Sequence, residues 1–303
     1  MVDQRVDAHL LRRRQLLQSH PEIRALEGNT LVTCVPIAAI FMVQLALSIW
    51  VQGQPWWLML VLAYSLGALL ALGLWALLHE CSHDLVFQRP TWNKWLGIIV
   101  GLPLIVPAAA TFRKCHLLHH KHPGDPVLDG DVPSRWEIEL VQNSATRKAI
   151  WLMAAPLLIS LRPIRMKSVK IFDQWLIRNF LLQIVFILLI LLYAGPKALC
   201  YLFLSNMFSL GLHPLGARWV QEHFHFFDGQ GTYSYYGIVN RLIFNAGYHV
   251  EHHDMMRVPW VSLPLLSRMA PELYAGLHSY RSWTRLLIRF LFDQKIGLDR
   301  RIT

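Results

Sequence analysis

Long apolar runs alternate with polar segments along the chain, and the lengths of these runs indicate helices that cross a membrane. No Asp, Glu, Lys or Arg occurs from Gly28 to His79, and Lys197 is the only charged residue from Asn179 to Ala217. A spanning helix needs about 20 mostly apolar residues. The pattern therefore predicts four transmembrane helices, at residues 31–51, 56–78, 175–194 and 198–216.

A fifth apolar stretch, from Trp95 to Phe112, contains two glycines and two prolines and is predicted to form a re-entrant or interfacial hairpin instead of a span. The distribution of basic residues supports this topology. With four spans, the two outward loops at residues 52–55 and 195–197 contain only Lys197 of the 29 Lys and Arg residues. Loops rich in Lys and Arg stay in the cytoplasm, so the other segments outside the spans are expected to lie there.

The polar remainder of the chain is expected to cover the cytoplasmic ends of the four spans. Residues 1–28 are predicted to form an N-terminal interfacial segment with an amphipathic helix near residues 8–18, and residues 79–148 and 217–303 to form a helical cap. We thus expect one all-α integral membrane domain over residues 1–303, with its N-terminus and cap in the cytoplasm. The membrane would be a bacterial inner membrane or the endoplasmic reticulum, depending on the source.

The composition agrees with a membrane protein and excludes several other classes. Charged residues make up 16% of the chain, against about 25% in soluble domains, and a hydrophobic content of 54% excludes a disordered chain. The net charge is +10, but the Lys and Arg residues are not concentrated in a soluble basic domain. Nucleic acid is therefore not an expected partner. The four cysteines form no CxxC pair, which excludes a thiolate zinc site.

The chain contains 15 histidines, and eight of them form three clusters with the spacing of metal ligands. The clusters are His79-Glu-Cys-Ser-His83, His116-Leu-Leu-His119-His120 and His249-Val-Glu-His252-His253. Residues three or four apart share one face of a helix, and imidazole is a ligand of iron, zinc, copper and nickel. Eight imidazoles exceed the four ligands of one tetrahedral zinc, so the clusters predict two metal ions with open positions.

A ninth ligand is expected in the segment that follows the fourth span. His223 follows Glu222 there and is the favoured candidate, with His213 as the next one. His225 and His122 are interpreted as structural, because neither belongs to a cluster pattern. The carboxylates beside the clusters, namely Glu80, Asp84, Glu251 and Asp254, are expected to orient the imidazoles as hydrogen-bond acceptors.

All three clusters fall at the predicted cytoplasmic ends of helices, where a metal can reach an acyl chain that rises out of the bilayer. A methylene group offers no polarity to recognise, so the substrate is expected to lie in a narrow apolar tunnel. Leu74, Leu77 and Met207 are the candidate tunnel residues, and Tyr235 and Tyr236 are candidates for a headgroup site. Packing within the protein is the alternative role for each of these side chains.

The sequence resembles the sphingolipid delta-4 desaturases, or dihydroceramide desaturases, of the membrane fatty acid desaturase/hydroxylase superfamily. The resemblance is carried by the three histidine clusters with their neighbours and by the segments Asp131-Val-Pro-Ser, Gly211-Leu-His-Pro and Thr232-Tyr-Ser-Tyr-Tyr-Gly. The HxxHH clusters indicate the wider superfamily, and the segment from Thr232 to Asp254 indicates the sphingolipid branch. The segment Met255-Met-Arg-Val-Pro-Trp260 departs from the pattern that this branch has after its third cluster.

This resemblance implies an oxidoreductase in which histidines hold two iron ions and O₂ is the co-substrate. The enzyme would remove hydrogens from C4 and C5 of a dihydroceramide-like long-chain base, and zinc could replace the iron on overexpression. The Glu-His-aromatic run at residues 222–224 also resembles an iron-binding element of membrane alkane hydroxylases, which favours His223 as a ligand. No segment has the pattern of a flavin or haem domain, so we expect an external electron donor, such as a small cytochrome or a ferredoxin with its reductase.

Three other functions stay open from the sequence alone. The same site could act as a C4-hydroxylase of the same lipid, or the chain could be a fatty-acyl desaturase. A membrane metal transporter or sensor is the alternative from another class. That function would need ligands near the middle of the bilayer, whereas the clusters here fall at helix ends.

Overall fold

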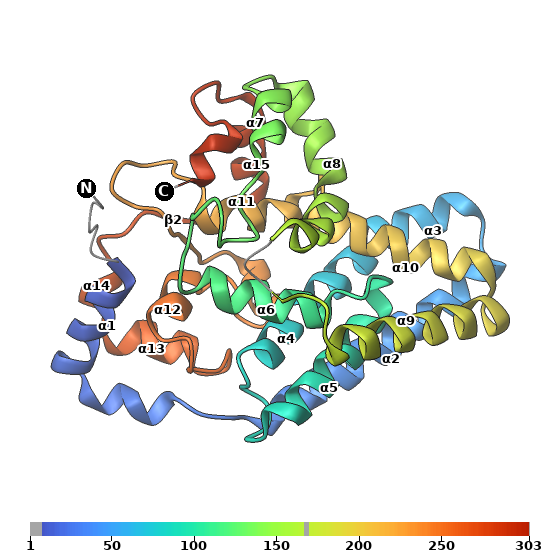
Figure 1. The fold of residues 1–303 in the computed structure, drawn as a ribbon, viewed down its shortest axis with the longest axis horizontal. Coiled ribbons are helices and arrows are strands. Elements are labelled where there is room, and N and C mark those ends of the chain that lie inside the picture. The colour runs from blue at the N-terminus through green and yellow to red at the C-terminus, as the bar shows by residue number, and fades with distance from the viewer. Residues whose placement is uncertain (1–7, 167–169, 303) are drawn as a thin grey trace.

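The computed structural model describes residues 8–166 and 170–302, and this part of the chain is mostly helical (Figure 1). The apolar helices are α2 (Cys34–Trp50), α3 (Trp56–Leu62), α4 (Ala68–Ser82), α9 (Gln174–Tyr193) and α10 (Gly195–Leu210). Helices α2, α3, α9 and α10 lie on the right of Figure 1, and α4 lies near its centre. Their outward faces expose large apolar side chains, among them Val35, Met42 and Leu192, as expected for a surface in contact with lipid.

The remaining helices form the hairpin and the cap. They are α1 (Ala8–Ser19), α5 (Pro90–Gly101), α6 (Ala109–His119), α7 (Arg135–Val141), α8 (Ala145–Leu161), α11 (Ala217–His223), α12 (His249–Asp254), α13 (Leu263–Met269), α14 (Pro271–Tyr274) and α15 (Trp283–Phe292). Short helical turns connect them, namely η1 (Pro21–Leu26), η2 (Leu31–Thr33), η3 (Val51–Gly53), η5 (Leu102–Leu104), η6 (Arg162–Arg165), η7 (Pro214–Gly216), η8 (Ile238–Ile243) and η9 (Leu298–Arg301). Two short strands, β1 (Ser234–Tyr235) and β2 (Ser279–Tyr280), pair in parallel within the cap.

The described part of the chain contains three helices long and apolar enough to cross a membrane, over Leu31–Gly53, Trp56–Ser82 and Gln174–Tyr193. These segments coincide with the first three predicted spans. Two further apolar segments are bent helix pairs, so the described residues contain up to five candidate spans. The prediction of an all-α membrane protein is thus confirmed at the level of helix content and candidate spans.

The second span is continuous although its middle is a turn of π-helix, η4 (Ala63–Gly67), between α3 and α4. A β-carbon at Gly67 would lie 2.3 Å from Ser205 Oγ, so glycine allows α10 to approach this turn closely. The carbonyl of Gly67 accepts a hydrogen bond from Gln44 Nε2 at 3.2 Å, and Tyr201 donates its hydroxyl to Gln44 Oε1 at 2.9 Å. Polar side chains from neighbouring helices therefore satisfy the backbone where the regular helix is interrupted.

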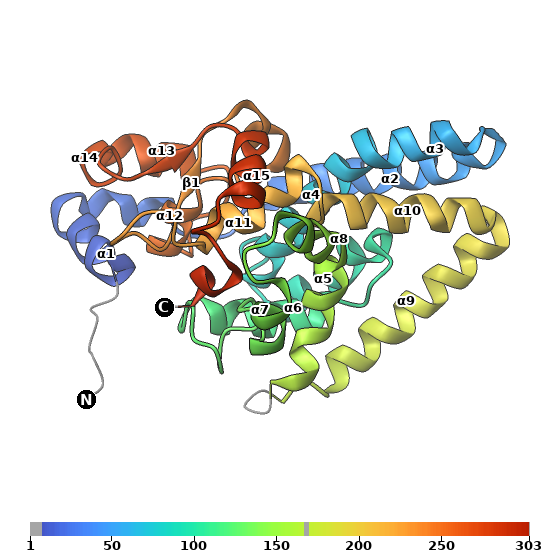
Figure 2. The same ribbon diagram turned by 90° about the horizontal axis from the view of Figure 1, so that it is seen from above.

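The predicted fourth span ends earlier than expected. Residues 198–216 were expected to form one helix, but α10 ends at Leu210 and the chain bends by 50° before η7 and α11. A β-carbon at Gly211 would lie 2.5 Å from the Met207 carbonyl oxygen, and Pro214 lacks the N–H that a continuing helix needs. The bend places α11 beneath the cap. At the other end of α10, α9 and α10 form a V whose apex is the turn at Gly195 (Figure 2).

The apolar stretch from Trp95 to Phe112 forms a sharp bend. The helix pair Pro90–Leu104 and Ala109–His119 is bent by 112°, and Ile105 at the turn has a positive φ of 60°. Both α5 and α6 pack against α4. This shape agrees with the predicted hairpin and not with a straight span.

The N-terminal helix forms where it was predicted, and residues 1–7 of the expected interfacial segment lie outside the described residues. Its apolar side chains do not gather on one strongly hydrophobic face, in contrast to the predicted amphipathic helix. Helix α1 contacts α12, and Leu16 is buried in a cluster with Val250 and Leu266. The helix therefore packs against the cap.

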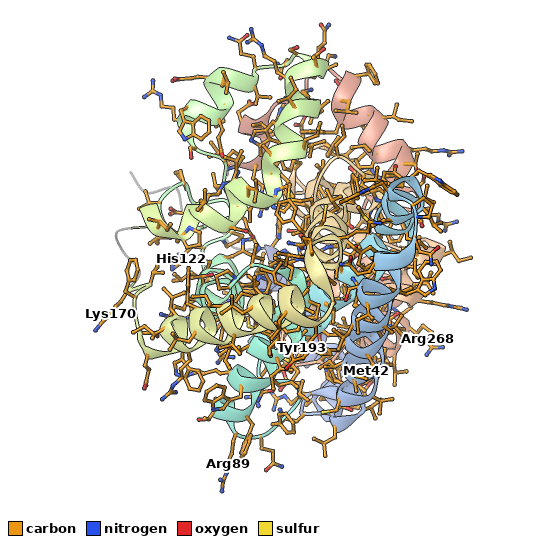
Figure 3. The ribbon with its side chains drawn as sticks, turned by 90° about the vertical axis from the view of Figure 1, so that its right-hand side faces the viewer. Met42, Arg89, His122, Lys170, Tyr193 and Arg268 are labelled. Atoms are coloured by element: carbon orange, nitrogen blue, oxygen red, sulfur yellow. The ribbon has the colours of Figure 1, made fainter. Side chains whose placement is uncertain are left out.

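The hairpin topology can be tested by labelling single cysteines in a background that lacks the four native ones. We expect Arg89→Cys and Lys121→Cys to react with a membrane-impermeant thiol reagent from the same side, because the chain must return between them. Both residues are exposed, and Arg89 projects outward just before α5 (Figure 3). Tyr193→Cys, at the turn between α9 and α10, should react only from the opposite side. Labelling of Arg89→Cys and Lys121→Cys from opposite sides would contradict the hairpin.

Candidate dimetal centre

The histidine clusters come together where the end of α4 meets α6, α11 and α12. His79 lies in the last turn of α4, His116 and His119 in the last turn of α6, and His223 in the last turn of α11. The third cluster makes up most of α12, a helix of six residues. Four helices that are distant in the sequence thus bring their imidazoles to one place.

The first group of candidate ligands has five members, with ligand atoms within 4.8 Å of one another. They are His79, His83, His116, His120 and His252. The Nε2 atom of His116 lies 2.9 Å from that of His83 and 3.0 Å from that of His120. The Nε2 atom of His252 lies 3.1 Å from that of His120 and 3.2 Å from that of His83. Four imidazole nitrogens therefore surround one point.

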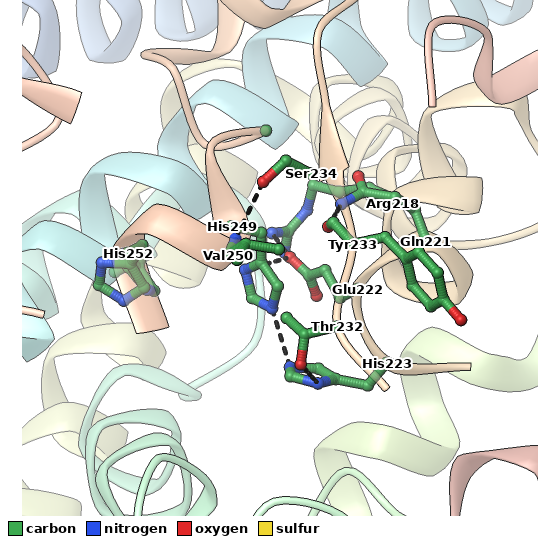
Figure 4. Close-up of polar contacts among 12 residues, drawn as sticks. Arg218, Gln221, Glu222, His223, Thr232, Tyr233, Ser234, His249, Val250 and His252 are labelled. Carbon is green, nitrogen blue, oxygen red and sulfur yellow. Dashed lines mark hydrogen bonds and ion pairs between the residues drawn. The ribbon is translucent and has the colours of Figure 1, made fainter. Parts of the chain in front are cut away.

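The second group lies beside the first and consists of His119, His223 and His253, with His249 at its edge. The Nε2 atom of His223 lies 2.9 Å from that of His119 and 2.8 Å from that of His249. Figure 4 shows His249 and His223 pointing toward each other from α12 and α11. All nine predicted metal ligands thus lie in one of two adjacent groups.

Each HxxHH cluster contributes to both groups. His116 and His120 belong to the first group while His119 belongs to the second. In the third cluster His252 belongs to the first group, and His253 belongs to the second. Neighbouring histidines on a helix point in directions about 100° apart, so a helix end that lies between two groups can serve both.

The distances and the protonation of these side chains fit a pair of transition-metal ions. Metal–imidazole bonds of about 2.0–2.1 Å place adjacent ligand nitrogens about 3 Å apart, as found in both groups. Burial, with the neighbouring charges, lowers the pKa of His249, His252 and His253 well below 6.5. These imidazoles are therefore neutral, which is the form that binds metals. The buried Nε2 atom of His253 has no hydrogen-bond partner among the described residues.

One carboxylate orients a candidate ligand directly, and the sequence analysis missed it. His119 Nδ1 lies 2.8 Å from Asp129 Oδ2, which also accepts the Gly124 N–H at 2.8 Å. Burial alone would raise the pKa of Asp129, but His119, Arg301 and the Gly124 N–H together lower it below its usual value. The ionised carboxylate holds the His119 ring with Nε2 toward the second group. Asp129 lies ten positions from its histidine in the sequence, where no cluster spacing points to it.

The four carboxylates expected to orient the ligands serve other contacts. Asp84 forms two hydrogen bonds with Arg113, at 2.9 and 2.7 Å, and so joins the end of α4 to α6. Glu251 accepts hydrogen bonds from Ser234 and Tyr236, both at 2.6 Å.

The other two carboxylates, Asp254 and Glu80, also form contacts between segments of the chain. Asp254 lies 2.6 Å from His9 Nδ1 and accepts a bond from Arg12 at 2.9 Å, and Glu80 accepts the Trp260 N–H at 3.1 Å. Among the described residues, none of the four is hydrogen-bonded to a candidate ligand, although Glu80 Oε1 lies 3.7 Å from His79 Nδ1. Their role is to position the helices that carry the ligands.

The remaining histidine candidates lie outside both groups. His213 accepts the Leu215 N–H through Nδ1 at 3.1 Å and packs edge-on against Tyr64, so it caps η7. The His225 backbone N–H bonds to the Arg300 carbonyl at 2.8 Å. His122 is exposed just after α6. These positions agree with the structural roles that the sequence favoured for His225 and His122.

An apolar cavity borders the candidate ligands. It contains about 930 Å³ of space between atoms, part of it open to the surroundings. Its walls include the candidate ligands His79, His116, His119 and His249. The apolar part of the lining includes Trp75, Ala108, Phe112, Pro156, Ile159, Leu210 and Trp219. The cavity therefore places apolar side chains beside histidines of both groups.

The predicted tunnel residues do not line this cavity. Leu74 and Leu77 are fully buried in a cluster with Ile98 and Val100 of α5, and Met207 is half-buried on α10. Trp75 and His79 are four residues apart and share the face of α4 that borders the cavity, whereas Leu74 and Leu77 lie on another face. The rotation of α4 about its own axis decides which of its side chains border the cavity. The apolar pattern of the sequence does not determine this rotation.

The predicted headgroup residues also have packing roles. Tyr235 is buried and its ring stacks on Trp283 at 4.1 Å between centroids. The Tyr236 hydroxyl donates to Glu251 at 2.6 Å and so holds α12. Tyr236 thus supports the third cluster, and neither residue borders the cavity described above.

Comparison with known proteins agrees with this site. Residues 55–284 match the family model described as fatty acid desaturase. The chain belongs to the fatty acid desaturase family. Its histidine groups are therefore those of a membrane-bound oxidoreductase family, as the sequence predicted.

Several curated relatives match this desaturase over nearly its whole length. Sphingolipid delta(4)-desaturase DES1-like of Oryza sativa subsp. japonica is 37% identical over 291 residues, which cover 96% of this chain and 88% of the relative. Sphingolipid delta(4)-desaturase/C4-monooxygenase DES2 of Homo sapiens is 37% identical over 296 residues, covering 97% and 91%. Sphingolipid delta(4)-desaturase DES1 of Drosophila melanogaster is 35% identical over 298 residues, covering 98% and 92%. The resemblance to sphingolipid delta-4 desaturases is confirmed.

Metal content tests the assignment of ligands in this desaturase. We expect the purified protein to hold about two metal ions per chain, and His119→Ala to hold fewer because the second group loses a central nitrogen. His122→Ala is the matched control from the same segment and should keep the wild-type content. Elemental analysis of detergent-purified protein measures both. Wild-type metal content in His119→Ala would remove this residue from the site.

The width of the cavity can be tested separately from the metals. Ile159→Trp should narrow the cavity and lower activity on long-chain lipids more than on short-chain ones, because the added ring occupies space that the longer chain needs. Leu188→Trp, on an exposed face of α9, is the control and should leave chain-length preference unchanged. Competition assays with lipids of two chain lengths measure the preference. An unchanged preference in Ile159→Trp would show that the substrate does not pass this residue.

Proposed function

We propose that this chain is an O₂-dependent, non-haem di-iron desaturase that forms a double bond between C4 and C5 of a dihydroceramide-like long-chain base. The observation that carries this proposal is the pair of adjacent histidine groups beside an apolar cavity. Relatives named sphingolipid delta(4)-desaturases match nearly the whole chain, which favours this substrate class over other lipids.

The proposed ligands are the nine histidines of the two groups. His79, His83, His116, His120 and His252 would hold one iron, and His119, His223, His249 and His253 would hold the other. The iron pair, once bound, supplies the reductive activation of O₂. The overall reaction takes two hydrogens from the lipid, two external electrons and two protons, and it releases two water molecules for each O₂.

The protein's own residues orient the lipid and keep water away from the reacting carbons. Trp75, Phe112 and Trp219 form apolar walls beside the histidines. A lipid chain bound between them presents only the methylenes that lie next to the metals. Regioselectivity then depends on where the lipid's polar end is held, since positioning is the main contribution that the chain can make to a reaction at an unactivated C–H bond.

We further propose the topology predicted from the sequence, in which the chain is one membrane-bound unit. The four spans cross the bilayer, and the hairpin, the N-terminal segment and the cap lie on the cytoplasmic side. The bent hairpin and the gathering of the basic residues outside the two outward loops support it. The net charge of +10 suits an acidic external electron donor that docks on the cap.

A C4-hydroxylase activity on the same lipid is the second candidate function. The human and bovine relatives named delta(4)-desaturase/C4-monooxygenase favour it, because their names join both reactions. Both outcomes begin with removal of a hydrogen beside the metals, and they differ in whether a second hydrogen leaves or oxygen is added to carbon. A fatty-acyl desaturase is the less favoured alternative, since the relatives given above are named for sphingolipids.

Expression in a host that lacks this activity tests the proposed function. We expect lipid mass spectrometry to show a sphingoid product lighter than its substrate by two hydrogens, with the double bond between C4 and C5. The variant His119→Ala is the control and should give no product. A product heavier by one oxygen would assign the hydroxylase function instead, and unsaturation confined to fatty acyl chains would contradict the sphingolipid assignment.

A further inference from the structure

Arg218 on α11 is a polar residue that borders the proposed reaction site without being a candidate ligand. Its Nη1 atom donates to Glu222 Oε1, one helical turn further on. Its Nε atom is buried and has no hydrogen-bond partner among the described residues. Buried donors are nearly always paired in native proteins, so an unpaired Nε–H in a cavity wall indicates a ligand that accepts a hydrogen bond there.

Arg218 lies at the junction of two cavities beside the histidine groups. The cavity described above and a smaller one next to it are both lined by Trp75, His79, Arg218 and His249. Figure 4 shows Arg218 reaching toward His249 and Glu222 from α11. A group bound to Nε therefore lies close to His79 of the first group and His249 of the second.

A second donor without a partner borders the same cavity. The buried Nε1 atom of Trp219 also lacks a hydrogen-bond partner among the described residues. In contrast, two hydroxyls of the lining donate to backbone carbonyls, Thr111 to Ala108 and Ser160 to Pro156. The groups left for a ligand on this wall are thus donors, and both arginine and tryptophan are donors only.

The proposed reaction requires such donors next to the metals. In a long-chain base the C3 hydroxyl stands on the carbon beside C4, so its oxygen cannot be far from the metals when C4 and C5 react. A mid-chain desaturation of a fatty acyl lipid differs, because its reacting carbons are remote from any oxygen. An arginine with a buried Nε–H in the wall of the reaction cavity is therefore expected for the first reaction and is unfavourable for the second.

We propose that Arg218 binds the C3 oxygen of the sphingoid base through its free Nε–H and thereby selects lipids that carry an oxygen next to the reacting carbons. Glu222 holds the guanidinium in place, and Arg218 is a specificity-determining residue of the substrate site. This proposal rests on the proposed function. The alternative is that Arg218 has only a positional role. In that case it would orient Glu222, whose Oε1 atom lies 3.6 Å from His249 Nδ1.

The test compares two lipids in the purified, metal-loaded enzyme. The first is an N-acyl dihydrosphingosine and the second is its 3-deoxy analogue, which lacks the C3 oxygen. We expect the wild type to convert the first with a kcat/KM about 10- to 100-fold higher, because the analogue leaves buried donors unpaired. Arg218→Lys keeps a cation beside Glu222 but has no Nε–H, and it should lose most of this preference through a higher KM for the first lipid.

Two further variants complete the experiment. Arg218→Met removes all donors and should show the same loss of preference if it folds, and Arg135→Gln is the control at an exposed surface ion pair. Metal content per chain is measured for every variant. A purely positional role predicts that both lipids lose kcat/KM by the same factor or that the metal content falls.

The outcomes separate the two proposals. The role of Arg218 would be overturned if both Arg218 variants kept the wild-type preference for the lipid with the C3 oxygen, or if their kcat/KM fell equally on both lipids. The proposed function would still stand in either case. The wild type could instead convert fatty acyl lipids and neither of the two sphingoid lipids. That result would overturn both the proposed function and the Arg218 proposal. Loss of the preference in Arg218→Lys, with unchanged metal content, is the result that supports the proposal.

Discussion

The structure depends on packing nine imidazoles side by side in two adjacent groups. Protonated imidazoles at nitrogen–nitrogen distances of 2.8–3.2 Å would repel one another strongly. Burial in the cap lowers the pKa of the α12 histidines and so favours the neutral form. Neutral imidazoles still point their lone pairs at one another, and bound metal ions remove that conflict. We therefore expect metal binding and the close approach of the four ligand-bearing helices to stabilise each other.

The approach of these helices is held by polar contacts outside the ligand groups. Arg113 joins α6 to the end of α4 through Asp84, and Asp129 fixes the ring of His119. Helix α12 has six residues and cannot hold its position alone. Its carboxylates Glu251 and Asp254 are bound by Ser234 and Tyr236 on one side and by His9 and Arg12 on the other. The N-terminal helix is thus part of the support of the third cluster, although it lies far from it in the sequence.

Local sequence patterns predicted the helices and the histidines that gather in the two groups, because both depend on short spacings. The apolar runs gave three of the spans closely, and the three clusters with His223 lie in the two groups. Features that depend on packing between distant segments were not predictable in this way. The face of α4 that meets the cavity is set by its contacts with α5 and α10, so Leu74 and Leu77 were chosen in place of Trp75. Asp129 and Arg218 have no spacing that relates them to a cluster, and only the folded chain places them beside His119 and His249.

The position of α11 connects the membrane part of the protein to its chemistry. The bend after Leu210 turns the chain out of the direction of α10, so that α11 crosses beneath the cap and carries His223 into the second group. The same turn of the chain brings Arg218 and Trp219 into the cavity wall, one helical turn before the ligand. A helix that continued straight on from Leu210 would carry these three side chains away from α6 and α12. One glycine- and proline-containing break therefore determines both where the second group forms and which polar groups border the cavity. In the proposed function, the same short helix carries a metal ligand and the residue that selects the substrate.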